Sequence, residues 1–169
     1  MVAQVAFFVS FAFACIAWGV VTARYLWPAL RGQGRAEALR PLLVIHSFRF
    51  IGLAFLVPGV VSPDLPRAFA TAAAFGDVIA AALALVTLLT LRSGAGLSLA
   101  WIFNVWGSVD IVNAFYQAGV SGLVPGQFGA AYFLPTAIVP LLLMTHGLAF
   151  RILLQHHHEP ALHERRQPA

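Results

Sequence analysis

The sequence predicts an all-α, polytopic membrane protein, folded as a bundle of five transmembrane helices. Two observations predict it. In composition, 60% of the 169 residues are hydrophobic and only 9% are charged, whereas about 25% of the residues of a soluble domain are charged. In pattern, five apolar stretches approach the length of about 20 residues that a helix needs to cross the hydrocarbon core. They are residues 5–26, 42–60, 69–91, 97–116 and 128–153, which places residues 1–154 in one transmembrane domain.

Short breaks rich in glycine, proline or arginine separate these stretches. Residues 27–40 contain two glycines among arginines, and residues 62–66 form a turn bounded by prolines. Residues 92–96 are short and glycine-containing, and residues 119–126 are uncharged and glycine-rich. Glycine and proline are the residues that most strongly interrupt regular structure. We therefore expect five helices joined by short loops, with no room for a soluble domain.

The arginines predict the orientation of the bundle. Six of them fall at one end of the predicted helices, namely Arg24, Arg31, Arg35, Arg40, Arg92 and Arg151. The opposite end has only Arg67, which Asp64 offsets. Since cytoplasmic loops carry the excess of basic residues, the N-terminus should lie outside and the C-terminus in the cytoplasm of a bacterial-type inner (plasma) membrane. The polar residues 155–169 are expected to be a disordered cytoplasmic tail. This orientation accounts for the basic charge, so no nucleic-acid partner is predicted.

Arg49 is the most informative polar residue for function, because it lies in the middle of a predicted membrane span. A central arginine costs at least about 2.5–3.5 kcal/mol even on the lenient insertion scales, so it persists only with partners. Asp77 and Asp110, in the third and fourth stretches, are the candidate partners. One fixed positive charge then faces two carboxylates, and neutrality requires a proton on an aspartate or on a histidine. Such a site is suited to proton coupling.

Further polar residues extend this candidate site. His46 lies one helical turn before Arg49, and His146 lies at the same depth in the fifth stretch, each about 7–8 Å from the cytoplasmic end. Asn113 and Gln117 share a helix face with Asp110. We predict a ligand- or proton-binding site made of His46, Arg49, Asp77, Asp110, Asn113, Gln117 and His146. Because the histidines lie in the cytoplasmic half, we expect a polar cavity that opens toward the cytoplasm.

The fifth stretch contains Pro135 and Pro140. Each proline removes a helical hydrogen bond, so a structural kink is expected there. Broken backbone at membrane depth is tolerated where it is buried or lines a cavity, and it often marks binding sites in transporters. A kink that only shapes the bundle is equally compatible with the sequence.

Four functions fit these residues, and the first is preferred. The protein binds or transports a small molecule or ion, with proton coupling. Alternatively it is an accessory or structural membrane subunit without chemistry of its own. It could also carry electrons through a haem b with His46 and His146 as axial ligands, or act as an intramembrane enzyme on a lipid or quinone. No catalytic residue is assigned. The expected partners are the lipid bilayer and an unknown small molecule, lipid or ion; a homodimer or a place in a larger membrane complex is left open.

Overall fold

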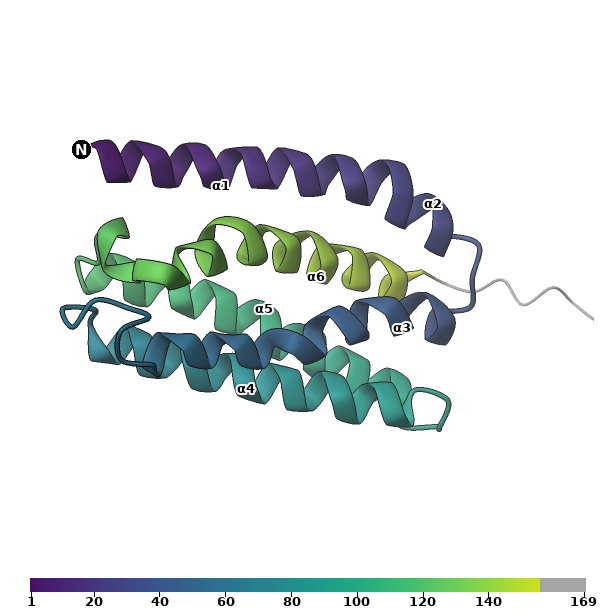
Figure 1. The fold of residues 1–169 in the computed structure, drawn as a ribbon. Coiled ribbons are helices and arrows are strands. Elements are labelled where there is room, and N and C mark those ends of the chain that lie inside the picture. The colour runs from purple at the N-terminus through teal and green to yellow at the C-terminus, as the bar shows by residue number, and fades with distance from the viewer. Residues whose placement is uncertain (156–169) are drawn as a thin grey trace, which may run out of the picture.

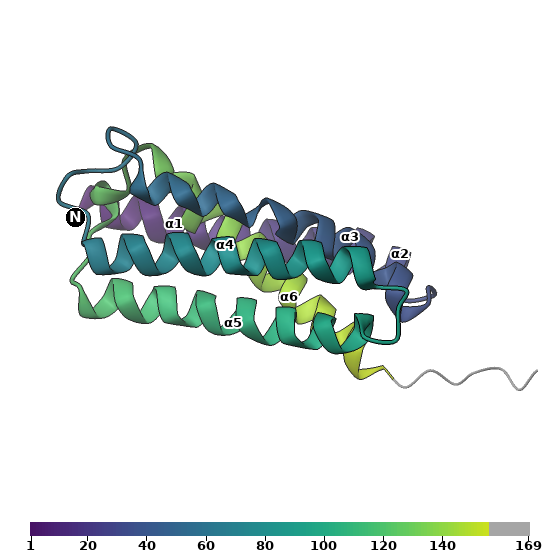
Figure 2. The same ribbon diagram turned by 90° about the horizontal axis from the view of Figure 1, so that it is seen from below.

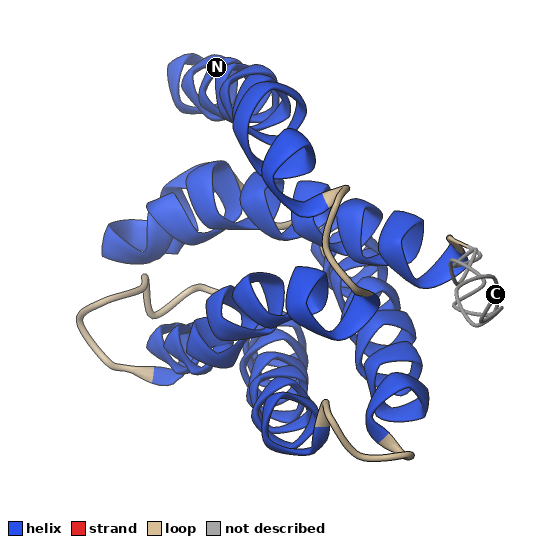
Figure 3. Ribbon diagram, turned by 90° about the vertical axis from the view of Figure 1, so that its right-hand side faces the viewer, coloured by secondary structure: helices blue, strands red, loops and turns tan. Residues whose placement is uncertain are grey.

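The computed structural model describes residues 1–155, which form a single helical bundle (Figure 1). Seen along its axis, this part of the chain consists of helices and loops (Figure 3). The six α-helices are α1 (Val2–Val21), α2 (Trp27–Leu30), α3 (Arg35–His46), α4 (Arg67–Thr90), α5 (Gly96–Val120) and α6 (Val139–Leu154). Shorter segments of other helical types continue them: η1 (Thr22–Leu26), η2 (Ser47–Leu56), η3 (Pro125–Tyr132) and η4 (Leu134–Ile138). The predicted disordered tail, Gln155 apart, lies outside the described residues.

Four helical segments are long and apolar enough to cross a membrane. They are Val2–Leu30, Arg35–Leu56, Arg67–Thr90 and Leu134–Leu154. Helix α5 corresponds to the remaining predicted span and has 25 residues, but it is not among these four. Its polar residues Asn104, Asp110, Asn113 and Gln117 explain this, because they reduce its hydropathy. The structure thus confirms an all-α bundle with four candidate spans.

The first two helices are longer than their apolar stretches. Residues 27–40 were expected to be a break, but α2 directly continues the first helix and α3 begins at Arg35. Only the turn at residues 31–34 interrupts them, and Gly34 adopts an extended conformation at its end. Pro41 lies inside α3. Hydropathy underestimated these helices because the residues at these ends include several arginines, which are polar but good helix formers.

The predicted fifth span over residues 128–153 begins later than expected. Gly129, inside η3, has a φ of +52° and interrupts the helical geometry of that segment. A Cβ atom at Gly129 would overlap the carbonyl oxygen of Val60, which accepts a hydrogen bond of 2.7 Å from the Ala130 N–H. The candidate span therefore begins at Leu134. Pro135 lies within the π-helix η4, and Pro140 follows in the first turn of α6.

The segment η2 is a 3₁₀-helix of ten residues. Runs longer than three or four residues are uncommon in this geometry, and side chains three positions apart lie directly above one another. Consequently Arg49, Gly52 and Phe55 form one buried row, which continues His46 at the end of α3. An α-helix would rotate such a row around its axis, whereas the 3₁₀ geometry keeps all four residues on the buried side of the segment.

The bundle has two hydrophobic cores with the polar residues between them. Helices α4 and α5 lie side by side and antiparallel (Figure 2). At the end of the bundle that holds α2 and the α4–α5 loop, Leu39, Leu42 and Phe103 belong to one densely buried core. Toward the N-terminus of the chain, Phe55, Phe69 and Phe128 belong to the other. The alanine face around Asp77 on α4 is buried: it comprises Ala70, Ala73, Ala74, Ala80, Ala81 and Ala84.

Helix α1 lies along one edge of the bundle (Figure 1) and contains no buried residue. Two hydrogen bonds connect it to the broken helix. Trp18 Nε1 donates to the carbonyl oxygen of Ala137 over 3.0 Å, and the Tyr132 hydroxyl lies 3.1 Å from the Ser10 hydroxyl. This helix therefore covers the bundle without being part of either core.

Candidate functional site

The guanidinium of Arg49 joins three helical segments at the middle of the bundle. Its Nε donates to Asp77 Oδ1 on α4 over 2.7 Å, and its Nη2 donates to Asp110 Oδ2 on α5 over 2.6 Å. Its Nη1 also donates to the carbonyl oxygen of Gly107 over 3.3 Å. The Arg49 side chain is only 2% exposed. The predicted ion pairs with both aspartates are thus confirmed, and they satisfy the arginine from two neighbouring helices.

His146 lies behind the guanidinium, in a chain of hydrogen bonds that determines its tautomer. Arg49 Nη1 lies 3.2 Å from His146 Nε2, and His146 Nδ1 lies 2.7 Å from Asn104 Oδ1. Because the arginine can only donate, Nε2 accepts and Nδ1 carries the ring proton. The Asn104 amide nitrogen in turn donates to the His146 carbonyl oxygen over 3.3 Å. His146 is therefore a neutral imidazole.

His46 is fully buried beside His146, and their ring centroids are 4.2 Å apart. Its Nε2 lies 3.0 Å from the Thr145 hydroxyl, whose proton is directed to the Leu141 carbonyl oxygen at 2.8 Å. Nε2 is then the donor. Among the described residues, Nδ1 of His46 has no hydrogen-bond partner. A second proton on this Nδ1 would create a buried positive charge without an acceptor there, so this ring is neutral as well. Both histidines thus contribute polarity to the cluster but no charge.

Glycines make this close packing possible. A Cβ atom at Gly52 on η2 would overlap the Asp77 carboxylate, and one at Gly76 on α4 would overlap the Asp110 carboxylate. A Cβ atom at Gly107 on α5 would lie 2.5 Å from His146 Cε1 and 2.8 Å from Arg49 Nη1. Small residues allow helices in lipid to approach closely. Here the close approach lets the Asp77 carboxylate contact the backbone of η2 at Gly52, and the Asp110 carboxylate contact the backbone of α4 at Gly76.

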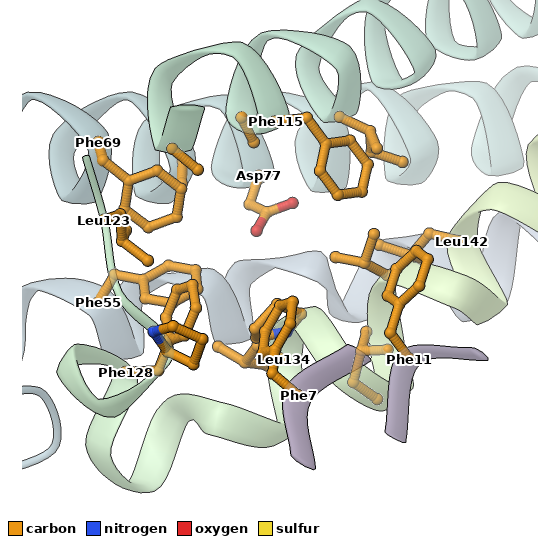
Figure 4. A pocket seen from close by; sticks show the side chains of 18 of the residues that line it. Phe7, Phe11, Phe55, Phe69, Asp77, Phe115, Leu123, Phe128, Leu134 and Leu142 are labelled. Carbon is orange, nitrogen blue, oxygen red and sulfur yellow. The ribbon is translucent and has the colours of Figure 1, made fainter. Parts of the chain in front are cut away.

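A cavity of about 330 Å³ lies on the other side of the guanidinium. Arg49, Asp77 and Asp110 are the charged residues that line it, and Gln4 adds an uncharged polar group. Apolar side chains make up the rest of its wall, with the Asp77 carboxylate pointing into the space between them (Figure 4). Six of the aromatic rings come from Phe7, Phe11, Phe55, Phe69, Phe115 and Phe128. The site is therefore an apolar chamber with charge at one end.

The cavity does not lie on the side of the histidines, where a polar cavity was predicted. The cavity is lined by Gln4, Phe69 and Leu123, which lie toward the end of the bundle opposite the arginine-rich loops. On the side of the histidines, Leu39, Leu42 and Phe103 fill the bundle. Neither histidine lines the cavity. The histidines thus lie beside a packed core in the arginine-rich half of the bundle.

The structure separates the predicted site residues into three groups. His46, Arg49, Asp77, Asp110 and His146 come together in the buried cluster described above. Asn113 and Gln117 are half-buried on α5, and within the described chain they neither line the cavity nor bond to the cluster. Pro135 lines the cavity and Pro140 does not.

Sequence reasoning did not assign the glycines, the phenylalanines or Thr145 to the site. The glycines gave a usable signal, because three apolar helices each carry one near a charged residue. The phenylalanines gave a weaker signal in the spacing of Phe7 and Phe11, which lie four residues apart and so share a helix face. The hydroxyl of Thr145 gave none.

The two histidines do not fit the axial positions of a haem. Ligation of one iron requires a ring nitrogen of each to face the other across the porphyrin. Instead, Nε2 of His46 is engaged by Thr145, and both nitrogens of His146 are engaged by Arg49 and Asn104. The short separation of the rings leaves no space for a porphyrin between them. Within residues 1–155, no group of three or more His, Cys, Asp or Glu residues could hold a metal ion.

Comparisons with known proteins place this chain in a family. No curated protein matches it, and no solved structure matches it. A family match extends over residues 6–154, which include the helices of the bundle except the first four residues of α1, and every residue of the buried cluster. The chain therefore belongs to the family described as Domain of unknown function (DUF8737).

Proposed function

We propose that this protein is a multi-pass protein of a bacterial-type plasma membrane, with α5 as a fifth span beside the four apolar ones. Packing of its polar side against η2 and α4 would shield Asn104 and Asp110 from lipid, which is how polar spans are accommodated. The arginine-rich ends support a cytoplasmic location for the α2–α3 turn, the α4–α5 loop and the end of α6. Arg92 bonds to Glu37 there over 3.0 Å, and the Arg151 guanidinium lies 3.7 Å from the centre of the Trp27 ring.

Its function, on this proposal, is to bind a small and largely apolar molecule in the cavity beside Arg49. The observation that carries it is the pairing of a chamber of about 330 Å³ with a few charged groups at one end. Ligand sites are typically concave and mostly apolar, with a small number of polar groups that orient the ligand. A polar cluster that only fixed helix packing would not need an open chamber next to it.

The proposal is limited to binding. Passage of a ligand across the membrane would need a route beyond the guanidinium toward the cytoplasm. That half of the bundle is occupied by the buried core around Leu39, Leu42 and Phe103. The exposed side chains at the rim of the cavity, Phe8 and Phe115, instead favour entry of a ligand from the bilayer between α1 and α5.

Filling the cavity tests the proposal. The probe is 4-phenylbenzyl alcohol, an uncharged biphenyl, and its binding to the protein in lipid nanodiscs is measured by equilibrium dialysis against empty nanodiscs. Ala114 lines the cavity, so Ala114→Trp should remove saturable binding. Ala82 is exposed on α4, and Ala82→Trp is the matched control that should bind like the unmodified protein. Equal saturable binding by both variants, or no saturable binding by the unmodified protein, would contradict the proposal.

A further inference from the structure

We propose that the cavity selects molecules that join an apolar, aromatic-sized body to a cationic amine head. This inference rests on the proposed binding function and specifies its ligand class. Three features of the chamber support it: the sign of the charge at its polar end, the accessibility of one carboxylate, and the aromatic character of its wall.

The charges at the polar end balance only if one aspartate holds a proton or a cation lies beside the carboxylates. Arg49 contributes one positive charge, and Asp77 and Asp110 contribute two negative charges when ionised. His146 is neutral because Nε2 accepts from Arg49, and His46 is neutral because its buried Nδ1 has no acceptor among the described residues, so neither ring supplies a further positive charge. No other charged residue among the described ones lines the cavity. An ammonium group beside the carboxylates would restore neutrality in a place where an uncompensated charge is costly.

The more accessible charged group in the chamber is a carboxylate. The side chain of Asp77 is 19% exposed, compared with 8% for Asp110 and 2% for Arg49. The guanidinium is enclosed by both aspartates, the Gly107 carbonyl oxygen and His146. A cationic head can therefore reach Asp77 directly. An anionic head would meet two carboxylates before it reached the arginine.

The wall of the chamber complements a cation as well as an apolar body. Phe55, Phe69 and Phe128 are in mutual ring contact, with centroids 5.4 to 6.1 Å apart. Phe7 stacks on Phe128 at 5.8 Å. The face of an aromatic ring attracts a cation that lies within about 6 Å of its centre, and the attraction is larger where water is excluded. Figure 4 shows the Asp77 carboxylate among these rings, so one ligand can contact both.

A matched series of probes tests the inference. 4-Phenylbenzylamine, 4-phenylbenzyl alcohol and biphenyl-4-carboxylate share one biphenyl body and differ in the charge of the head group. Dissociation constants are measured in nanodiscs of an uncharged lipid, with empty nanodiscs as the reference for partitioning into the bilayer. We expect the amine to bind at least about tenfold more tightly than the alcohol, and the carboxylate to bind most weakly.

Two substitutions of an aspartate by asparagine test whether the preference for the amine arises from the Asp77 carboxylate. Asp77→Asn should reduce the preference for the amine over the alcohol to about threefold or less, since it removes the accessible charge. Asp64→Asn makes the same chemical change at an exposed position outside the cavity and should keep the full preference. Circular dichroism and gel filtration establish that each variant is folded. If Asp77→Asn does not fold, the order of the three probes on the unmodified protein still decides.

The possible outcomes distinguish a failure of the amine preference from a failure of the proposed binding function. Binding of all three probes with equal affinity, or tightest binding of the carboxylate, would overturn the amine inference and leave the binding function standing. Failure of every probe to bind above the empty nanodisc would overturn both. An amine preference that Asp64→Asn abolishes and Asp77→Asn retains would overturn the assignment to this cavity.

Discussion

At the scale of single residues, the buried cluster is a set of charges that depend on one another. Arg49 is satisfied by Asp77 and Asp110 at distances typical of charge-assisted hydrogen bonds. A buried ion pair adds little net stability over a well-packed apolar pair, but removal of one partner is costly because it leaves the other charge buried. The cluster therefore constrains which substitutions the fold tolerates.

Removal of the arginine is the first test at this scale. We expect Arg49→Met to lower the free energy of unfolding by about 3–5 kcal/mol, because two carboxylates lose their common partner. The measurement is unfolding in mixed detergent micelles, followed by tryptophan fluorescence. Arg92→Met is the matched control. Arg92 is 74% exposed and pairs with Glu37 at the surface, so its loss should cost no more than about 1 kcal/mol.

Neutralising all three charged residues at once tests why Arg49→Met is destabilising. It distinguishes the loss of the carboxylates' charge partner from the loss of the packing of the arginine side chain. The triple variant Arg49→Met, Asp77→Asn, Asp110→Asn contains no buried charge in the cluster. It should recover most of the stability that Arg49→Met loses, since neutral replacement of a complete buried charge set is often close to neutral in stability. A triple variant less stable than Arg49→Met alone would show that the ion pairs are not what the arginine contributes.

At the scale of elements, the site depends on how closely three helical segments approach. The 3₁₀ geometry of η2 aligns Arg49 with Gly52, and α4 then packs its Asp77 carboxylate against that glycine. On α4, Gly76 receives the carboxylate of Asp110 in the same way. Two features absent from the hydropathy pattern, a 3₁₀ run and two glycine contacts, thus hold the charged groups together.

Addition of one methyl group tests these contacts. Gly52→Ala and Gly76→Ala should each destabilise the protein by about 1–3 kcal/mol, because the new Cβ meets a carboxylate whose position is fixed by its hydrogen bond to Arg49. Gly147→Ala is the control within α6, where a Cβ would have no neighbour within 4 Å. There alanine should stabilise the helix by up to about 1 kcal/mol. Equal effects at all three positions in the unfolding assay would contradict the assigned contacts.

Sequence patterns predicted these elements to different extents. The ion pairs of Arg49 were predictable, because a charge in an apolar segment needs an opposite charge and the chain offers two at similar depth. The break at Gly129 was not, because it depends on the Val60 carbonyl oxygen, which reaches it from a distant loop. Asn113 and Gln117 were misplaced for a related reason. The side of α5 that faces the cluster is defined by Asn104, Gly107 and Asp110, and the later residues of the polar face have turned away.

At the scale of the whole molecule, the bundle has a packed half and a hollow half with the charged cluster between them. The depth of each histidine, estimated from the helical rise per residue, correctly placed His46 and His146 at the same level of the bundle. It could not predict which half of the bundle would contain a cavity. That depends on how the side chains fill space. Leucines and Phe103 fill the half around the histidines, whereas in the other half a chamber remains among phenylalanines of α1, η2, α4, α5 and η3.

The orientation of the bundle gives a prediction at this scale. In a Cys15→Ala background, a single cysteine at Asp64 should react with a membrane-impermeant maleimide in intact cells. A single cysteine at Ser93, in the α4–α5 loop, should react only after the cells are lysed. This order follows from the excess of arginine at the end that contains Ser93. The opposite order would reverse the proposed topology and place the cavity in the cytoplasmic half.

The most direct test of the central claim is photo-crosslinking of a diazirine derivative of 4-phenylbenzylamine to the protein in nanodiscs, with the labelled residues mapped by mass spectrometry. If the chamber beside Arg49 is the binding site, labelling concentrates on α1 around Phe7 and Phe11 and on α4 near Asp77, and an excess of unlabelled amine displaces it. Ala114→Trp should abolish that labelling and Ala82→Trp should not. Labelling that the unlabelled amine cannot displace, or that falls on lipid-facing residues such as Leu89, which is 84% exposed, would contradict the account.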